Sequence, residues 1–312
     1  MTTTERTDPP AVTLATERPS RHLGLLVASV LAGIALAVFW SFELVDQTIG
    51  ANVADTLLGH DAKATALGGS AAALVFAFVS GLAGTFTACN IAMVASILPM
   101  GHAGAARHVR SPGLRSMLRP LGLLTLGMVA VSAVYGFVGV LIGDSLPQLS
   151  TNTVGGMPVR LLQSVVVFGV IGLAFVYLGL AALGTVPDPF ASRPAGRVVV
   201  LGALIGGFLI GRPYPLFNKL FHWAADNGNP LYGAGAFVLQ SLGNITIVAT
   251  LFALVVLVSR GSALRWLAGH PRRTLAVTGA LLLALGVFTV VYWTVRVPAS
   301  FGFGWFPVMP YK

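Results

Sequence analysis

The sequence predicts an all-α polytopic membrane protein with seven transmembrane helices, in which one N-terminal helix precedes an inverted repeat of three plus three helices. Hydrophobic residues make up 55% of the 312 residues and charged residues only 9%, whereas a soluble domain carries about a quarter charged residues. Apolar segments recur at the length of roughly 20 residues that crosses a bilayer core of about 30 Å. The net charge of +9 comes from loop arginines that are not interleaved with aromatic residues. The predicted partner is therefore the lipid bilayer, and nucleic acid is excluded.

The chain opens with a polar tail, residues 1–21, which contains prolines and charges of both signs and is predicted to be flexible and cytoplasmic. Its length and acidic residues are not typical of a signal peptide. Seven apolar segments follow, and the tail that ends the chain, residues 296–312, is rich in aromatic residues that favour the outer membrane interface. The predicted spans are residues 22–44, 65–100, 120–146, 161–186, 197–221, 231–259 and 273–295.

Arginines in the loops predict the orientation of these spans. Seven crossings that begin inside place most loop arginines in the cytoplasm, and the opposite loops carry most of the aspartates, as the positive-inside rule requires. The N-terminus is therefore expected in the cytoplasm and the C-terminus outside, in a bacterial-type inner membrane. The arginines on the predicted inner side are Arg6, Arg18, Arg21, Arg107, Arg110, Arg115, Arg119, Arg193, Arg197, Arg260, Arg265, Arg272 and Arg273.

Two units of three spans, residues 65–186 and 197–295, begin with similar interrupted segments. The first unit carries GLAGTFTACN early in a segment that is too long for one straight helix, and the second carries GGFLIGRPYPLFN in the same place. Glycines permit a helix to break, and prolines remove backbone donors. An odd number of spans per unit makes the two units enter the membrane from opposite sides, which predicts an inverted repeat with both breaks near the midplane.

These motifs resemble the DsbD/CcdA superfamily, the membrane thiol-electron carriers of disulfide reduction and cytochrome c maturation. Its six core helices form two inverted triplets, and each leading helix carries a Pro-Cys among glycines; Ala88–Cys89 and Pro213–Tyr214 occupy those places here. The stretch GAFVLQSLGNI also resembles the middle helix of the family's second triplet. The resemblance covers roughly residues 65–295, and it implies thiol-electron transfer with a thioredoxin-like or cytochrome partner protein.

Cys89 is the candidate catalytic residue and the only cysteine in the chain. In the family that the chain resembles, two cysteines form a reversible disulfide, but Tyr214 stands in the place of the second one. One sulfur cannot complete thiol–disulfide exchange within a single chain, so Cys89 would form a mixed disulfide with an external partner protein or a small thiol. The alternative is a small buried residue that permits close helix packing. A lone cysteine and scattered histidines give no ligand pattern, and we expect no metal or cofactor.

Arg212 is the candidate contact for an anionic group, because a charge within a span costs at least about 2.5–3.5 kcal/mol. The alternative is that the span ends early and that Arg212 and Lys219 extend to the outer headgroups. Asn90 and Asn244 are expected in a central polar cluster, whereas Gln163 is expected to bridge helices. The predicted substrate-binding residues are Thr85, Thr87, Asn90, Arg212, Tyr214 and Asn244.

Three functions follow from these patterns. The first is a thiol-electron carrier that uses Cys89 with an external partner. The second is a transporter of a small anionic or sulfur-containing solute on the same inverted-repeat scaffold. The third is a non-catalytic subunit of a larger membrane complex, docked through the extra first helix and the aromatic tail.

Overall fold

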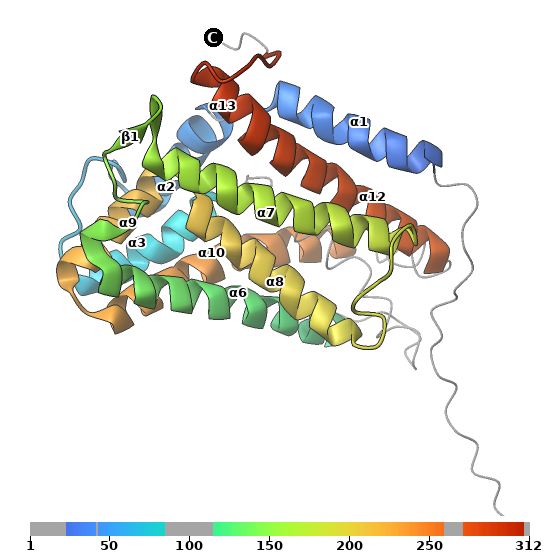
Figure 1. Ribbon diagram of the computed structural model, residues 1–312. Coiled ribbons are helices and arrows are strands. Elements are labelled where there is room, and N and C mark those ends of the chain that lie inside the picture. Colours follow the sequence, from blue (N-terminus) through green and yellow to red (C-terminus); the bar gives the residue numbers. More distant parts are fainter. Residues whose placement is uncertain (1–22, 42, 85–114, 259–270, 309–312) are drawn as a thin grey trace, which may run out of the picture.

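The computed structural model describes residues 23–41, 43–84, 115–258 and 271–308, and the fold in that part of the chain is a bundle of helices (Figure 1). The only strands there are β1, Thr153–Val154, and β2, Met157–Pro158, which pair as a small antiparallel hairpin. Among the described residues, four helices are long and apolar enough to cross a membrane, and the predicted all-α class is confirmed in this part of the chain. Their apolar stretches are Arg119–Ile142, Val159–Ala182, Pro194–Gly211 and Arg273–Ser300.

The N-terminal part of the bundle differs from the predicted spans. Helix α1, Leu23–Phe39, ends before the predicted limit of residue 44. The predicted outer loop that follows is helical instead, with the π-helical turn η1, Glu43–Gly50, and helix α2, Ala51–Leu58. Helix α3, Ser70–Ala83, lies within the predicted second span, residues 65–100, and the rest of that span after Gly84 lies outside the described residues.

The remaining helices follow the predicted spans with one interruption. Helices α6, Arg115–Ile142, and α7, Val159–Ala182, are joined by the 3-10 turn η3, Gly143–Ser145, and the β-hairpin. The predicted fifth span is broken into α8, Pro194–Gly211, and α9, Pro215–Asn227. The sixth is α10, Pro230–Val258, and the seventh runs from α12, Pro271–Val290, through the π-helical turn η4, Val291–Arg296, to α13, Val297–Ser300.

Glycines bring the central helices into backbone contact, as small residues do in membrane bundles. A Cβ added to Gly81 of α3 would lie 2.0 Å from the carbonyl oxygen of Gln240 on α10, and one added to Gly202 of α8 would lie 2.0 Å from that of Leu124 on α6. Helix α6 also packs on α10, α7 packs on α12, and α1 packs on α12 at the edge of the bundle (Figure 1).

Apolar residues cover the outward faces of two of these long apolar helices. Leu126, Val134 and Leu141 on α6, and Val166 and Val170 on α7, each expose more than half of their surface. They recur at helical spacing and so form continuous stripes. Stripes of this kind suit contact with lipid and not with water.

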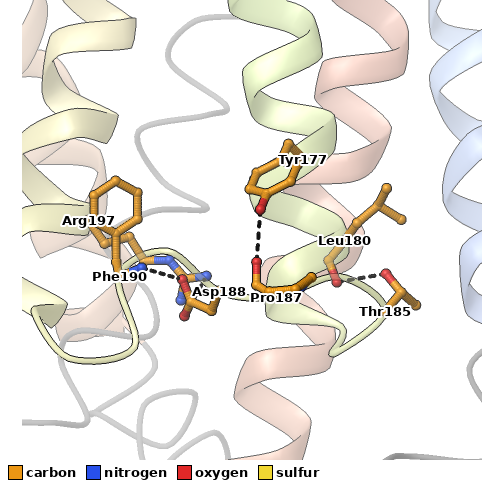
Figure 2. Close-up of polar contacts among 7 residues, drawn as sticks. All are labelled: Tyr177, Leu180, Thr185, Pro187, Asp188, Phe190 and Arg197. Atoms are coloured by element: carbon orange, nitrogen blue, oxygen red, sulfur yellow. Dashed lines mark hydrogen bonds and ion pairs between the residues drawn. The ribbon is translucent and has the colours of Figure 1, made fainter.

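The turn between α7 and α8 is held by polar contacts within it (Figure 2). The hydroxyl of Tyr177 donates to the carbonyl of Pro187 at 3.0 Å, and the carboxylate of Asp188 accepts from the backbone N–H of Phe190 at 2.9 Å. Asp188 also forms an ion pair with Arg197 at 3.4 Å. The start of α8 is thereby fixed against the end of α7.

Candidate functional site

The break between α8 and α9 follows directly from its sequence, GRPYP. Pro213 and Pro215 have no N–H group, so a helix continued through them would lose two hydrogen bonds. Arg212 and Tyr214 adopt extended backbone conformations (ψ 111° and 131°), and Pro215 begins α9 at a position that suits proline. The broken leading helix predicted for the second unit is present.

Side chains from other elements satisfy the carbonyls that the break releases. Gln163 of α7 donates from Nε2 to the carbonyl of Ile210 at 2.8 Å, which confirms that this amide bridges two helices. Gln148, only 2% exposed, donates to the carbonyl of Arg212 at 2.7 Å and to Oδ1 of Asn218 at 2.9 Å. The break is therefore a built feature with its own hydrogen-bond partners and not a local distortion.

Arg212 is buried at this break, with 7% of its surface exposed. Its guanidinium carbon lies 5.0 Å from the centre of the Tyr214 ring and 4.9 Å from that of Phe217, so the charge is held between two aromatic faces. Nη1 donates to the carbonyl of Gly84 at 3.4 Å, directly after the end of α3. Arg212 thus faces protein, whereas extension to the outer headgroups would have left it exposed.

Lys219, seven residues further along, does not share this site. Its Nζ donates to the carbonyl of Ala62 at 2.6 Å and also to the carbonyl of Thr65, and it lies 5.1 Å from the centre of the Phe76 ring. Lys219 therefore contacts the middle of α3 and the segment before it, while Arg212 contacts the residue that follows α3. Helix α3 therefore runs antiparallel to α9, and Gly84, directly after its end, contacts Arg212 at the break.

We call the group formed by Gly84, Arg212, Pro213 and Tyr214, where the end of α3 contacts the break between α8 and α9, the junction. The ring of Tyr214 is fully buried, and a Cβ added to Gly50 of η1 would lie 2.8 Å from its hydroxyl oxygen. The η1 turn therefore covers the junction. This cover was not predicted, because the segment reads as a polar outer loop.

A small cavity adjoins the junction and has space for about one water molecule. We call it the central cavity. Helices α3, α6, α8, α9 and α10 and the break between α8 and α9 contribute to its wall, and apolar side chains make up much of it. Its polar side chains are Arg212, Gln240, Ser241 and Asn244.

Polar groups of α10 that face this cavity are incompletely paired. Gln240 is 1% exposed, and neither its Nε2 nor its Oε1 has a hydrogen-bond partner among the described residues; the same holds for Oδ1 of Asn244. Ser241 differs, because its hydroxyl contacts that of Ser132 on α6. A buried polar group without a partner costs about 1–3 kcal/mol, so these three unpaired atoms need an explanation.

The structure thus brings together two of the predicted site residues, Arg212 and Asn244, around one cavity, with Tyr214 stacked against Arg212. Thr85, Thr87, Cys89 and Asn90 lie outside the described residues. Sequence analysis did not include Gln240 or Gln148 in the site. Gln240 lies one helical turn before Asn244 on the same face of the helix, and this spacing is the sequence signal that points to it. No sequence signal marks Gln148.

No group of acidic, histidine or cysteine side chains suited to a metal ion occurs in the described part of the chain. A scan against family models and searches of curated proteins and of solved structures found no match for this chain.

Proposed function

We propose that this chain is a seven-span membrane protein with an inverted three-plus-three repeat, and that it transfers thiol electrons through Cys89 in the manner of the DsbD/CcdA superfamily that its motifs resemble. The observation that carries the proposal is the junction. The buried guanidinium of Arg212 contacts Gly84, five residues before Cys89 in the sequence.

The helix contacts support the inverted repeat. The leading helix of each unit packs on the middle helix of the other: α3 on α10 through Gly81, and α8 on α6 through Gly206, whose added Cβ would lie 2.8 Å from the carbonyl oxygen of Met128. The third helices, α7 and α12, pack on each other with the facing glycine pairs Gly172–Gly286 and Gly179–Gly279. Two units related by a twofold axis make equivalent contacts in this way, because each contact from the first unit to the second is repeated from the second to the first.

The chemistry needs a thiolate, and a neighbouring cation favours that form over the thiol. In the proposed cycle the Cys89 thiolate attacks a disulfide of the partner protein, which forms a mixed disulfide and releases one partner thiolate. A donor dithiol then displaces the second partner thiolate and, by closing its own disulfide, returns Cys89 to the thiolate. The partner disulfide is reduced, the donor dithiol is oxidised, and Cys89 is unchanged.

Thiol trapping tests this function. Cells are quenched with acid and alkylated, and the protein is run on a non-reducing gel, where we expect an adduct that reductant removes. Cys89→Ser abolishes the adduct, and the neighbouring change Ala88→Ser, which keeps the thiol, preserves it. Absence of any reducible adduct on the unaltered protein, under conditions that trap a known membrane thiol carrier, contradicts the proposal.

A transporter of a small anionic solute is the second candidate, and the buried cation that Arg212 places beside the central cavity favours it. In proteoliposomes, Arg212→Gln then abolishes solute uptake, while Cys89→Ser leaves most of it. The matched control is Arg160→Gln, since Arg160 is exposed at the start of α7. Uptake that falls equally in both arginine variants counts against a transport site at Arg212.

A further inference from the structure

The unpaired amides of the central cavity point to a ligand. Gln240 and Asn244 lie one turn apart on α10, and both contribute to the wall of the same cavity. Gln240 is 1% exposed and lacks partners for both amide atoms among the described residues, and Oδ1 of Asn244 also lacks one. At the depth of a membrane span no bulk water is at hand to satisfy such groups.

The chemistry of these groups selects the kind of ligand. Two amide oxygens need a donor, and the amide nitrogen of Gln240 needs an acceptor. The amide of Gln240 can also be placed in the flipped orientation, with its nitrogen and oxygen interchanged. In either orientation it presents one hydrogen-bond donor group and one acceptor. A halide only accepts hydrogen bonds, and the guanidinium of Arg212 in the cavity wall repels a cation. The ligand must both donate and accept.

The size of the cavity completes the selection, because it has space for about one water molecule and is polar enough to hold one. We infer that the central cavity binds one buried water molecule, held by the side-chain amides of Gln240 and Asn244 beside the guanidinium of Arg212. This water links α10 to the junction. The inference depends on the cavity alone and goes beyond the proposed function, so failure of either leaves the other standing.

Radiolytic labelling detects such a water, because X-rays generate hydroxyl radicals from bound water and these oxidise a neighbouring methionine. Met128 lies in the wall of the cavity and is 3% exposed, while Met157 is equally buried at 5% but lies in the β-hairpin, away from the cavity. We expect Met128 to be oxidised several-fold faster than Met157 in purified protein. Gln240→Leu should reduce the rate of Met128 to that of Met157. Equal rates in the unaltered protein overturn the inference.

Thermal unfolding supplies a second measurement that does not depend on labelling. If water is bound, Gln240→Leu removes the hydrogen bonds between Gln240 and this water, which then holds the Asn244 oxygen less well. We therefore expect Tm to fall by about 2–4 °C. The effect of Asn244→Leu should then be smaller in the Gln240→Leu background than alone. With a dry cavity, Gln240→Leu removes two unpaired polar atoms and raises Tm, which overturns the inference.

Thr278 provides the matched control for this measurement. Its hydroxyl is also buried without a partner among the described residues, but it lies on α12, away from the cavity. Thr278→Val should leave Tm unchanged or raise it, because no ligand is lost there. A fall in Tm as large as that of Gln240→Leu overturns the assignment to a bound water. A bound anion would give a different result: chloride would raise Tm relative to gluconate in the Gln240→Leu variant but not in the Arg212→Gln variant. That result overturns the inference of a bound water in favour of an anion.

Discussion

At the residue scale, Lys219 holds the segment that precedes α3, residues 61–65. Its ammonium group accepts no hydrogen bonds and needs acceptors for three N–H groups, and the carbonyls of Ala62, Lys63 and Thr65 provide them. Within the same segment, the carboxylate of Asp61 accepts from the backbone N–H groups of Lys63 and Ala64, and these bonds hold the pKa of Asp61 below its usual value. Residues 61–65 are thus held by Lys219, which lies outside the segment, and by Asp61, which lies within it.

Replacement of Lys219 by methionine should release this segment without unfolding the bundle. Methionine keeps the apolar contact with Phe76 but offers no donor to the three carbonyls, so backbone amides in residues 60–66 should exchange with solvent several-fold faster. Hydrogen exchange measured by mass spectrometry checks this. Lys63→Met is the control, since the Lys63 side chain is exposed. Unchanged exchange in Lys219→Met would show that other contacts hold the segment.

The charged residue of the site, Arg212, could be predicted from the sequence more readily than its amide residues, Gln240 and Gln148. Arg212 was predictable, because a charge inside an apolar segment, followed by two prolines, has few structural explanations. Gln240 was marked only by its spacing from Asn244, and an amide that bridges helices has the same sequence environment as one in the wall of a cavity. Gln148 lies in a predicted outer loop, and only the three-dimensional arrangement brings it to the carbonyl of Arg212.

At the scale of elements, glycines decide how closely α6 and α8 approach. Gly202 faces the carbonyl of Leu124 so closely that even a methyl group would lie 2.0 Å from it. Gly122, two residues before Leu124 on α6, has nothing within 4 Å of an added Cβ. Two glycines at the same helix pair therefore have opposite roles, because one permits backbone contact and the other only adds flexibility.

Substitution by alanine should separate these two roles. Gly202→Ala must push the helices apart, and overpacking of this kind destabilises by about 1–3 kcal/mol. Gly122→Ala should instead stabilise by roughly 0.5–1 kcal/mol, because alanine restricts the unfolded chain. Thermal unfolding in detergent measures both. Loss of stability in both variants, or in neither, would mean that the contact between α6 and α8 does not depend on Gly202.

The sequence predicted most elements well where the hydrophobic pattern is strong, as for α6, α7 and α10, and it located the break before α9 from its two prolines. It did not predict η1 and α2. That stretch, residues 43–58, carries several polar residues and no long apolar run, so it reads as a loop. Its helical packing depends on small residues such as Gly50 and Ala54, which contact Tyr214 and its neighbours and carry little hydrophobic signal.

At the scale of the whole molecule, the two ends of α7 lie at opposite ends of the bundle. The β-hairpin lies before α7, and the C-terminal segment joins it there, because the ring of Phe303 would lie 3.4 Å from a Cβ on Gly155. The turn of residues 183–193 follows α7 at the other end. The predicted orientation therefore places the hairpin and the C-terminal segment outside and this turn inside.

Labelling of single cysteines should show that orientation, since Cys89→Ser removes the only native thiol. In that background, Asn152→Cys and Ser300→Cys should react with a membrane-impermeant maleimide in intact cells. Ser192→Cys should react only after the cells are permeabilised. All three positions are exposed, so a lack of reaction reports sidedness and not burial. The reverse pattern would mean that the chain enters the membrane from the other side.

The contact between Arg296 and α1 has a consequence for biogenesis. Nη1 of Arg296 donates to the carbonyls of Ala37, in the last turn of α1, and Trp40, directly after it, at 2.5 and 2.6 Å. A helix end leaves carbonyls at such positions without intrahelical partners. The ribosome synthesises Arg296 256 residues after Trp40. Among the described helices, α1 therefore cannot complete this contact until the chain has been synthesised as far as residue 296.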